Sequence, residues 1–216
     1  MTSVLVLKTS ILGRDSVSNG LIQQFVQRVS AADPQAHIRQ RDFATETMPQ
    51  FEHETLQALM REASQRSPAQ RELVAYADQL VSELQAANLL VIGAPMYNFT
   101  VPATLKSWID HVARAGVTFK YTEKGAVGLL DSKQVVVFTT MGGRHEPGES
   151  DHVRPYLETV LGFLGLDRVE MVVADGLNLG EESRRQSLES AQKHLDAVAA
   201  RVTRDLQQSE KAEVAA

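Results

Sequence analysis

The chain has 216 residues, 43% of them hydrophobic, and a formal net charge of -5 at pH 7, which suits one domain with a sizeable core. It contains no cysteine, which excludes disulfides, thiol nucleophiles and cysteine-ligated iron–sulfur clusters. The mild acidity provides no basic stripe for nucleic acid, and no apolar run is long enough to span a membrane. The N-terminus lacks the pattern of a signal peptide, so we expect a cytoplasmic protein.

Short runs rich in branched residues predict five strands, at residues 4–7, 37–41, 89–92, 135–139 and 169–173. The second run is polar and indicates an edge strand. Helical spacing predicts helices around residues 21–29, after Ser67, after Pro102, at 156–164 with Gly165 as C-cap, and from about Glu182 to Leu206. Ser67, Pro68 and Gln70 form a strong helix start signal.

This alternation of strands and helices predicts a doubly wound α/β fold with a five-stranded parallel sheet and helices on both faces. The polar second strand favours the order 2-1-3-4-5. Residues 1–206 are expected to form a single domain, and residues 207–216 a flexible polar tail. Two segments interrupt the alternation: residues 45–66, of mixed helical character, and residues 117–130, which have the pattern of a small hairpin.

In an open parallel sheet, ligands bind outside the carboxyl ends of the strands, where the strand order reverses. The loop after the first strand carries Ser10, Ser16, Val17 and Ser18 at the start of a helix. Hydroxyl groups and free helix N–H groups suit a phosphate. The alternative is that these serines only cap the helix. The patterns GxGxxG and GxxxxGK[ST] are absent, which argues against a Rossmann dinucleotide site and a P-loop.

The two other loops at this edge are suited to a planar ring. After the third strand come Pro95, Met96, Tyr97, Asn98 and Phe99, which either line a ring system or cover the end of the core. After the fourth strand come Thr140, Met141, Gly142 and Gly143, where paired glycines allow close backbone approach or merely make a turn. A ligand with a phosphate at one end and a planar ring at the other fits all three loops, and FMN has that shape. The six histidines form no recognisable ligand pair, so we expect no metal site.

Several stretches are similar to one known family. They are residues 4–12 with 16–18, residues 94–99, residues 113–123, residues 155–157 and residues 161–163. On these stretches the chain resembles the bacterial FMN-dependent NADH azoreductases, from the first strand to roughly Gly180. The pattern of Pro95, Tyr97, Asn98 and Pro102 is shared more widely among flavodoxin-like quinone and FMN reductases.

The resemblance implies a flavodoxin-like homodimer that binds FMN through Ser10, residues 16–18, residues 96–99 and residues 140–143. It also implies two-electron reduction of quinones and azo compounds by NADH or NADPH, in ping-pong fashion. The alternative function is a flavodoxin-type electron carrier without its own turnover.

Four further residues are candidates for roles next to the cofactor. Phe119, Tyr121 and Phe163 are candidates for the walls of the acceptor pocket, some from the partner subunit, or for ordinary core packing. His145 follows the glycine pair and is the candidate proton donor, with solvent as the alternative. Arg61 and Arg66 either favour the extra phosphate of NADPH or lie on a solvated helix face.

Overall fold

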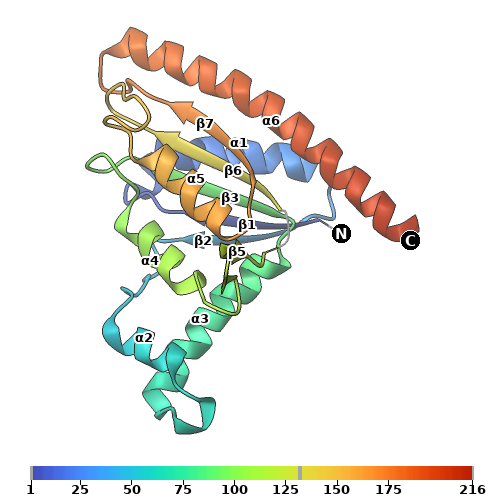
Figure 1. Cartoon of the computed structure of the whole chain (residues 1–216). Coiled ribbons are helices and arrows are strands. Elements are labelled where there is room, and N and C mark those ends of the chain that lie inside the picture. Colours follow the sequence, from blue (N-terminus) through green and yellow to red (C-terminus); the bar gives the residue numbers. More distant parts are fainter. Residues whose placement is uncertain (1, 131–132, 216) are drawn as a thin grey trace.

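The computed structural model describes residues 2–130 and 133–215. Its main sheet has five parallel strands in the order β2-β1-β3-β6-β7, which confirms the predicted fold and strand order (Figure 1). The strands are β1 (Ser3–Lys8), β2 (His37–Asp42), β3 (Leu89–Pro95), β6 (Gln134–Thr140) and β7 (Arg168–Ala174). β3 is buried along its whole length, whereas β2 is largely exposed, as expected for an inner strand and an edge strand.

Helices cover both faces of this sheet and divide the core into two layers (Figure 1). α1 (Val17–Ala32) and α6 (Glu181–Ala215) pack on one face. α3 (Pro68–Ala86), α4 (Ala103–Val112) and α5 (Val153–Phe163) pack on the other. Because α1 follows β1 and α6 follows β7, and these strands are parallel, the first turns of both helices lie at the edge of the sheet where the strands end.

The helix boundaries follow the predicted capping chemistry. The Ser67 hydroxyl accepts a hydrogen bond from the Gln70 N–H, and the Gln70 side chain accepts one from the Ser67 N–H, so α3 begins with a complete capping box. α5 ends before Gly165, whose φ of +92° is the left-handed conformation that favours glycine.

The two segments that interrupt the alternation are short structured excursions. Residues 45–66 contain α2 (His53–Met60) and the 3₁₀ turn η2 (Ala63–Gln65), beside α3 at the end of the molecule opposite α6 (Figure 1). The predicted hairpin is confirmed as β4 (Phe119–Thr122) paired antiparallel with β5 (Gly125–Gly128). A Cβ added at Gly128 would lie 2.1 Å from the Gly165 backbone nitrogen, so the hairpin packs directly against the end of α5.

The last helix is longer than expected. We predicted an end near Leu206, but α6 continues to Ala215, and Figure 1 shows it projecting beyond the sheet. The physical reason is that the sequence from Gln207 onward contains neither glycine nor proline to stop a helix. The flexibility of residues 207–216 stays a prediction, and Ala216 lies outside the described residues. None of the helices within residues 2–130 and 133–215 combines the length and apolar character needed to cross a bilayer.

Candidate functional site

The three loops singled out above meet on one cavity at the point where the strand order reverses. β1 lies between β2 and β3. The connection from β1 leads to β2 on one side, and the connection from β3 leads to β6 on the other side, so the strand order reverses between β1 and β3. The cavity has a volume of about 340 Å³, and we call it the loop cavity. Its lining comprises Ser10, Leu12, Asp15, Ser16, Val17, Pro95, Met96, Tyr97, Thr140, Met141, Gly142, Leu177, Asn178 and Arg184.

The start of α1 forms one end of the loop cavity. The Ser16 hydroxyl accepts a hydrogen bond from the Asn19 N–H at 3.2 Å, which confirms that Ser16 caps the helix. The first intrahelical bond runs from the Gly20 N–H to the Ser16 carbonyl. The N–H groups of Val17 and Ser18 therefore have no acceptor within the helix. Ser18 is fully buried, with its Oγ 3.0 Å from Ser16 Oγ, and it is not part of the cavity lining.

Tyr97 joins the loop after β3 to the loop after β1. Its hydroxyl lies 3.1 Å from Ser10 Oγ and accepts a hydrogen bond from the Ile11 N–H at 3.2 Å. The N–H of the neighbouring Met96 donates to the Thr140 carbonyl at the end of β6 at 2.9 Å. Residues 96 and 97 therefore connect all three loops, which holds the cavity walls in one relative geometry.

A tight turn follows Tyr97. Asn98 and Phe99 both adopt positive φ, of 49° and 71°, an unusual conformation for residues other than glycine. Hydrogen bonds in both directions between Tyr97 and Thr100 close the turn. Phe99 is 54% exposed and does not line the loop cavity, so the turn presents an aromatic ring to the outside.

A second, largely apolar cavity adjoins the first. It has a volume of about 580 Å³, lies beside the start of α4, and shares Tyr97 with the loop cavity. We call it the α4 hollow. Its lining comprises Ile11, Tyr97, Asn98, Thr100, Val101, Pro102, Ala103, Thr104, Lys106 and Tyr156. The Tyr156 hydroxyl is held neutral, because burial, aided by the charge of Asp110, raises the pKa of Tyr156 to about 12.

The glycine pair after β6 is supported by a fourth loop that sequence reasoning missed. Backbone N–H groups of Gly176, Leu177 and Asn178 donate to the carbonyls of Gly143, Met141 and Gly142 at 2.8, 3.1 and 2.9 Å, respectively. A Cβ at Gly142 would lie 2.6 Å from Asn178 Nδ2, so a side chain at 142 would have to displace the Asn178 amide. The sequence offers one signal for this loop, its place in the chain, because it also follows the carboxyl end of a parallel strand.

The structure brings Phe119, Tyr121 and Phe163 together, but away from both cavities. The rings of Phe119 and Phe163 have centroids 4.4 Å apart, and Tyr121 lies edge-on to Phe119 at 5.4 Å. Phe119 is buried against the core, whereas Tyr121 is 75% exposed. None of the three lines the loop cavity or the α4 hollow of the same chain.

His145 lies against the glycine pair. A Cβ added at Gly143 would lie 2.9 Å from His145 Nε2, so the ring covers that glycine. Its Nδ1 is 3.0 Å from Ser150 Oγ, and the ring lies edge-on to Phe99 with centroids 5.7 Å apart. The histidine therefore packs between the turn after β3 and the loop after β6, with one ring nitrogen already hydrogen-bonded.

Two arginines considered for a nucleotide phosphate are engaged near α2. Arg66 Nε donates to the carbonyls of Ala58 and Arg61, both at 3.0 Å, which satisfies the end of α2. Arg61 Nη1 lies 3.4 Å from the Gln70 side-chain oxygen. These contacts favour a structural role in the excursion for both side chains.

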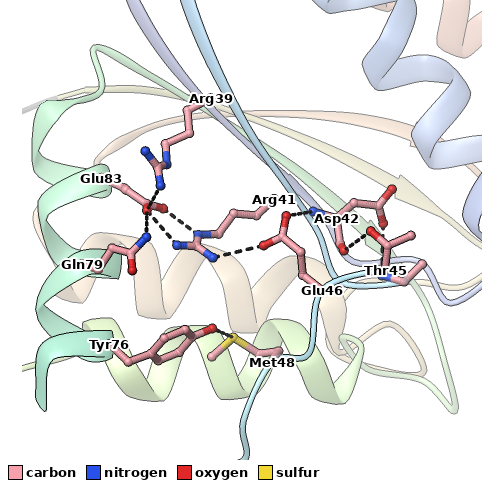
Figure 2. Close-up of polar contacts among 10 residues, drawn as sticks. Arg39, Arg41, Asp42, Thr45, Glu46, Met48, Tyr76, Gln79 and Glu83 are labelled. Carbon is pink, nitrogen blue, oxygen red and sulfur yellow. Dashed lines mark hydrogen bonds and ion pairs between the residues drawn. The ribbon is translucent and has the colours of Figure 1, made fainter. Parts of the chain in front are cut away.

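A second group of charged residues lies away from the loops, on β2 and α3. Figure 2 shows the Glu83 carboxylate between two arginines: Arg41 binds it through two nitrogens at 2.6 and 2.7 Å, and Arg39 at 2.5 Å. Gln79 donates to the same carboxylate at 3.0 Å, and Arg41 also binds Glu46 at 3.1 Å. We call these five residues the Glu83 cluster.

Charges within the Glu83 cluster neutralise one another. Burial by itself would raise the pKa of Glu83, but the hydrogen bonds and charge of Arg41, with Gln79 and Arg39, lower it overall. The pKa of Arg41 is raised by its hydrogen bond to Glu83, despite burial. Neighbouring Tyr76 has a pKa raised first by burial, and its hydroxyl lies 3.5 Å from Met48 Sδ (Figure 2). Within the described residues, no group of three or more carboxylates and histidines is arranged to hold a metal ion.

Comparison with known proteins agrees with this architecture. The family model described as "Flavodoxin-like fold" matches residues 2–199. An FMN-dependent NADH:quinone oxidoreductase of Shewanella loihica is 48% identical over 200 residues, 93% of this chain and 100% of that protein. The protein of the same name from Vibrio vulnificus is 46% identical over 200 residues, with the same shares covered.

Solved structures show the same fold. An azoreductase from Bacillus anthracis superposes with a TM-score of 0.82 at 28% identity, covering 94% of this chain and 100% of that one. An FMN-dependent NADH-azoreductase from Bacillus anthracis, solved in complex with FMN, superposes with a TM-score of 0.85 at 24% identity and the same coverage. This chain therefore belongs to the flavodoxin-like family that includes the FMN-dependent NADH:quinone oxidoreductases.

Proposed function

We propose that this chain is an FMN-dependent NADH:quinone oxidoreductase that also reduces azo compounds. Curated relatives of that name are 44–48% identical over almost the whole chain, and one structural relative is an azoreductase at 28% identity. The observation in this chain that carries the proposal is the loop cavity, where a helix N-terminus, an aromatic loop and a glycine loop line one space.

The residues of the loop cavity fit FMN. The free N–H groups of Val17 and Ser18, with the Ser16 hydroxyl, suit the phosphate. Pro95, Met96 and Tyr97 offer a wall for the planar ring. We propose FMN contacts from the predicted residues that line the loop cavity, Ser10, Ser16, Val17, Pro95, Met96, Tyr97, Thr140, Met141 and Gly142. Ser18, Asn98, Phe99 and Gly143 lie outside that lining, and their contacts with FMN stay predictions from the sequence. When bound, FMN supplies the two-electron redox chemistry that no side chain of this chain can supply.

The protein's own contribution is orientation and electrostatics. The missing side chains of Gly142 and Gly143 make room for Asn178 and His145, and backbone N–H groups of this loop would stabilise negative charge on a ring edge. NADH is the proposed donor, with NADPH as the alternative. Donor and acceptor would occupy the same place in turn, which gives ping-pong kinetics.

We also propose a homodimer with an acceptor pocket shared between subunits. Tyr121 is 75% exposed and lies off both cavities of its own chain, so it can wall an acceptor pocket only on a second copy. Exposed Ile11 and Phe99, at 69% and 54%, lie beside the site and would be covered by such a partner. Phe119 would support Tyr121 through their edge-on ring contact, and Phe163 would in turn pack against Phe119.

His145 is the proposed proton donor to the reduced acceptor, because it lies against Gly143 at the edge of the site. The His145→Ala variant should lose quinone reductase rate, with an altered pH profile, relative to a His194→Ala control on the exposed face of α6. A rate that is unchanged across pH would assign the proton to solvent.

The function is tested with the purified full-length chain. A visible spectrum should show flavin absorbance, and menadione should be reduced by NADH with parallel double-reciprocal plots. A chain that binds FMN but does not turn over with NADH and menadione would be an electron carrier, as in the alternative function. A colourless chain that gains no flavin absorbance on addition of FMN would contradict the whole proposal.

Light scattering in solution tests the oligomeric state, with the dimer mass expected and a monomer mass contradicting the shared pocket. A Tyr121→Ala variant should keep FMN and raise the KM for the quinone. A cytoplasmic location stays a prediction from the sequence pattern, and cell fractionation tests it.

A further inference from the structure

We propose that Arg184, on the first turn of α6, is a phosphate-binding residue that pairs with the FMN phosphate. The inference rests on the proposed FMN site and adds a residue from outside the three predicted loops. Arg184 lines the loop cavity together with Ser16 and Val17, which form the proposed phosphate end. It is the single basic side chain in that lining.

The position of Arg184 is set by contacts that run back to the glycine loop. The Ser183 hydroxyl donates to the Gly176 carbonyl at 2.9 Å, which ties the first turn of α6 to the loop after β7. That loop in turn donates three backbone hydrogen bonds to residues 141–143. Val17 at the start of α1 and Arg184 at the start of α6 line the same cavity, so these two helix starts lie near each other. Arg184 is therefore carried on a structured part of the cavity wall.

The electrostatic setting argues for an anionic partner. A cation in the first turn of a helix opposes the helix dipole, so Arg184 is poorly placed for helix stability. Its neighbour Arg185 sits in the same turn but is compensated by Glu182 at 2.7 Å and Glu189 at 2.7 Å. Among the described residues, Arg184 makes no such ion pair. An exposed guanidinium without a carboxylate partner remains available to a ligand.

The same wall also needs a positive charge if a phosphate binds there. Asp15 lines the loop cavity close to Ser16, and its carboxylate would repel a phosphate of charge near -2. The helix N-terminus contributes only about half a positive charge. A guanidinium can donate two parallel N–H bonds to phosphate oxygens, and such charge-assisted bonds are roughly twice as strong as neutral ones. Arg184 therefore offsets Asp15 and adds directional donors.

The test compares two flavins that differ only in the phosphate. The purified full-length chain, freed of flavin, is titrated with FMN and with riboflavin, and flavin fluorescence reports binding. Arg184→Gln should weaken FMN binding about tenfold and riboflavin binding less than about twofold. The tenfold loss is typical of one partly exposed charge-assisted contact. Arg184→Lys should recover part of the loss. Arg185→Gln, one residue along and already paired with glutamates, is the matched control and should change neither.

The salt dependence provides a second readout. FMN affinity of the unaltered chain should fall more steeply with NaCl than that of Arg184→Gln, because one screened ion pair is missing from the variant. The assignment would be overturned if Arg184→Gln lost equal affinity for FMN and riboflavin, if it lost affinity for neither, or if only the KM for NADH changed. A chain that binds neither flavin before any substitution would overturn the proposed function, and this assignment with it.

Discussion

The Glu83 cluster and the loop cavity are two polar regions beside the same sheet, and they differ in whether their polar groups have partners within the chain. In the Glu83 cluster, every charged group faces an opposite charge within the chain, and Glu83 and Arg41 are almost completely removed from solvent. Around the loop cavity, Arg184 has no carboxylate partner among the described residues, and the N–H groups of Val17 and Ser18 have no helical acceptor.

The difference distinguishes polar residues that stabilise the fold from polar residues that are available to bind a ligand. A buried ion pair that is internally satisfied tolerates no loss of one partner, because the other is left charged and desolvated. Open donors at a solvent-accessible cavity cost little in the free protein and gain their partners on binding. Substitutions in the Glu83 cluster should therefore change stability, and substitutions around the loop cavity should change flavin affinity.

The largest expected effect is loss of stability on replacing Glu83. Glu83→Ala leaves Arg41 buried with only the more exposed Glu46, and we expect the free energy of unfolding to fall by about 3 kcal/mol. Urea unfolding measures this, with Glu182→Ala, in an exposed pair with Arg185, as the control that should lower the midpoint far less. A Glu83→Ala midpoint equal to the control would show that the cluster does not hold the edge of the sheet.

The same carboxylate should make stability depend on pH. The pKa of Glu83 in the folded chain is lowered from its ordinary value of 4.5, so its stabilising contribution is complete above that pH. It is lost as the pH falls below 4.5 toward the folded pKa, because the unfolded chain takes up the proton first. Acid unfolding of Glu83→Gln should be less steep than that of the unaltered chain in this range. Parallel curves for the two proteins would contradict the assignment.

On the cavity side, the largest effect is expected from Gly142→Ala. The new methyl would lie 2.6 Å from Asn178 Nδ2 and push that amide from the cavity wall, so FMN should bind about fivefold more weakly. Fluorescence titration measures the affinity. The double variant with Asn178→Ala should bind FMN no more weakly than Asn178→Ala alone, because the amide that the methyl displaces is already absent, a non-additivity that only contacting residues show. Simple addition of the two single effects would argue against the contact.

Tyr97→Phe should have a smaller effect, on both the free energy of unfolding and the affinity for FMN. It removes the hydroxyl that contacts Ser10 Oγ and the Ile11 N–H, and we expect about 1 kcal/mol less stability. FMN affinity should fall about threefold, because the two loops lose a shared contact. Tyr121→Phe is the matched control, since that ring is 75% exposed. If the two variants behave alike in unfolding and in titration, Tyr97 does not join the loops.

The smallest effect is a gain. Gly20 lies within α1, and an added Cβ there would meet nothing within 4 Å. Gly20→Ala should raise the free energy of unfolding by about 0.5 kcal/mol while leaving FMN affinity unchanged. Thermal unfolding with parallel titration checks both. A shift in FMN affinity would mean that stability and binding are not separable at the start of α1.

Local chemistry was enough to predict much of this molecule. The strand runs, the Ser67–Gln70 capping box and the hairpin depend on neighbours in the chain, and each is confirmed. The polar second strand indicated its place at the edge, and the order of strands then located the loops. The sequence prediction ends α6 too early, because the polar composition after Leu206 indicates fraying although no glycine or proline there stops the helix.

The cavity lining was predicted only in part. Loops after the first, third and fourth strands carried recognisable phosphate, aromatic and glycine patterns, and residues from all three line the cavity. The loop after β7 carries no such pattern, and its Leu177 and Asn178, with Arg184 of the following helix α6, enter the lining because β7 pairs with β6. Phe99 was expected in the lining but projects outward from a turn with positive φ.

By itself, the sequence determined which segments are strands and helices, the fold class, and the edge of the sheet where a ligand would bind. These depend on periodicity, capping and burial, which act between residues close in the chain. Only the tertiary structure decided which charges neutralise one another and which remain open. Arg41 and Glu83 are 42 positions apart, and Arg184 lines the same cavity as Ser16 and Val17 although it lies near the other end of the chain, so these arrangements depend on packing that no local pattern encodes.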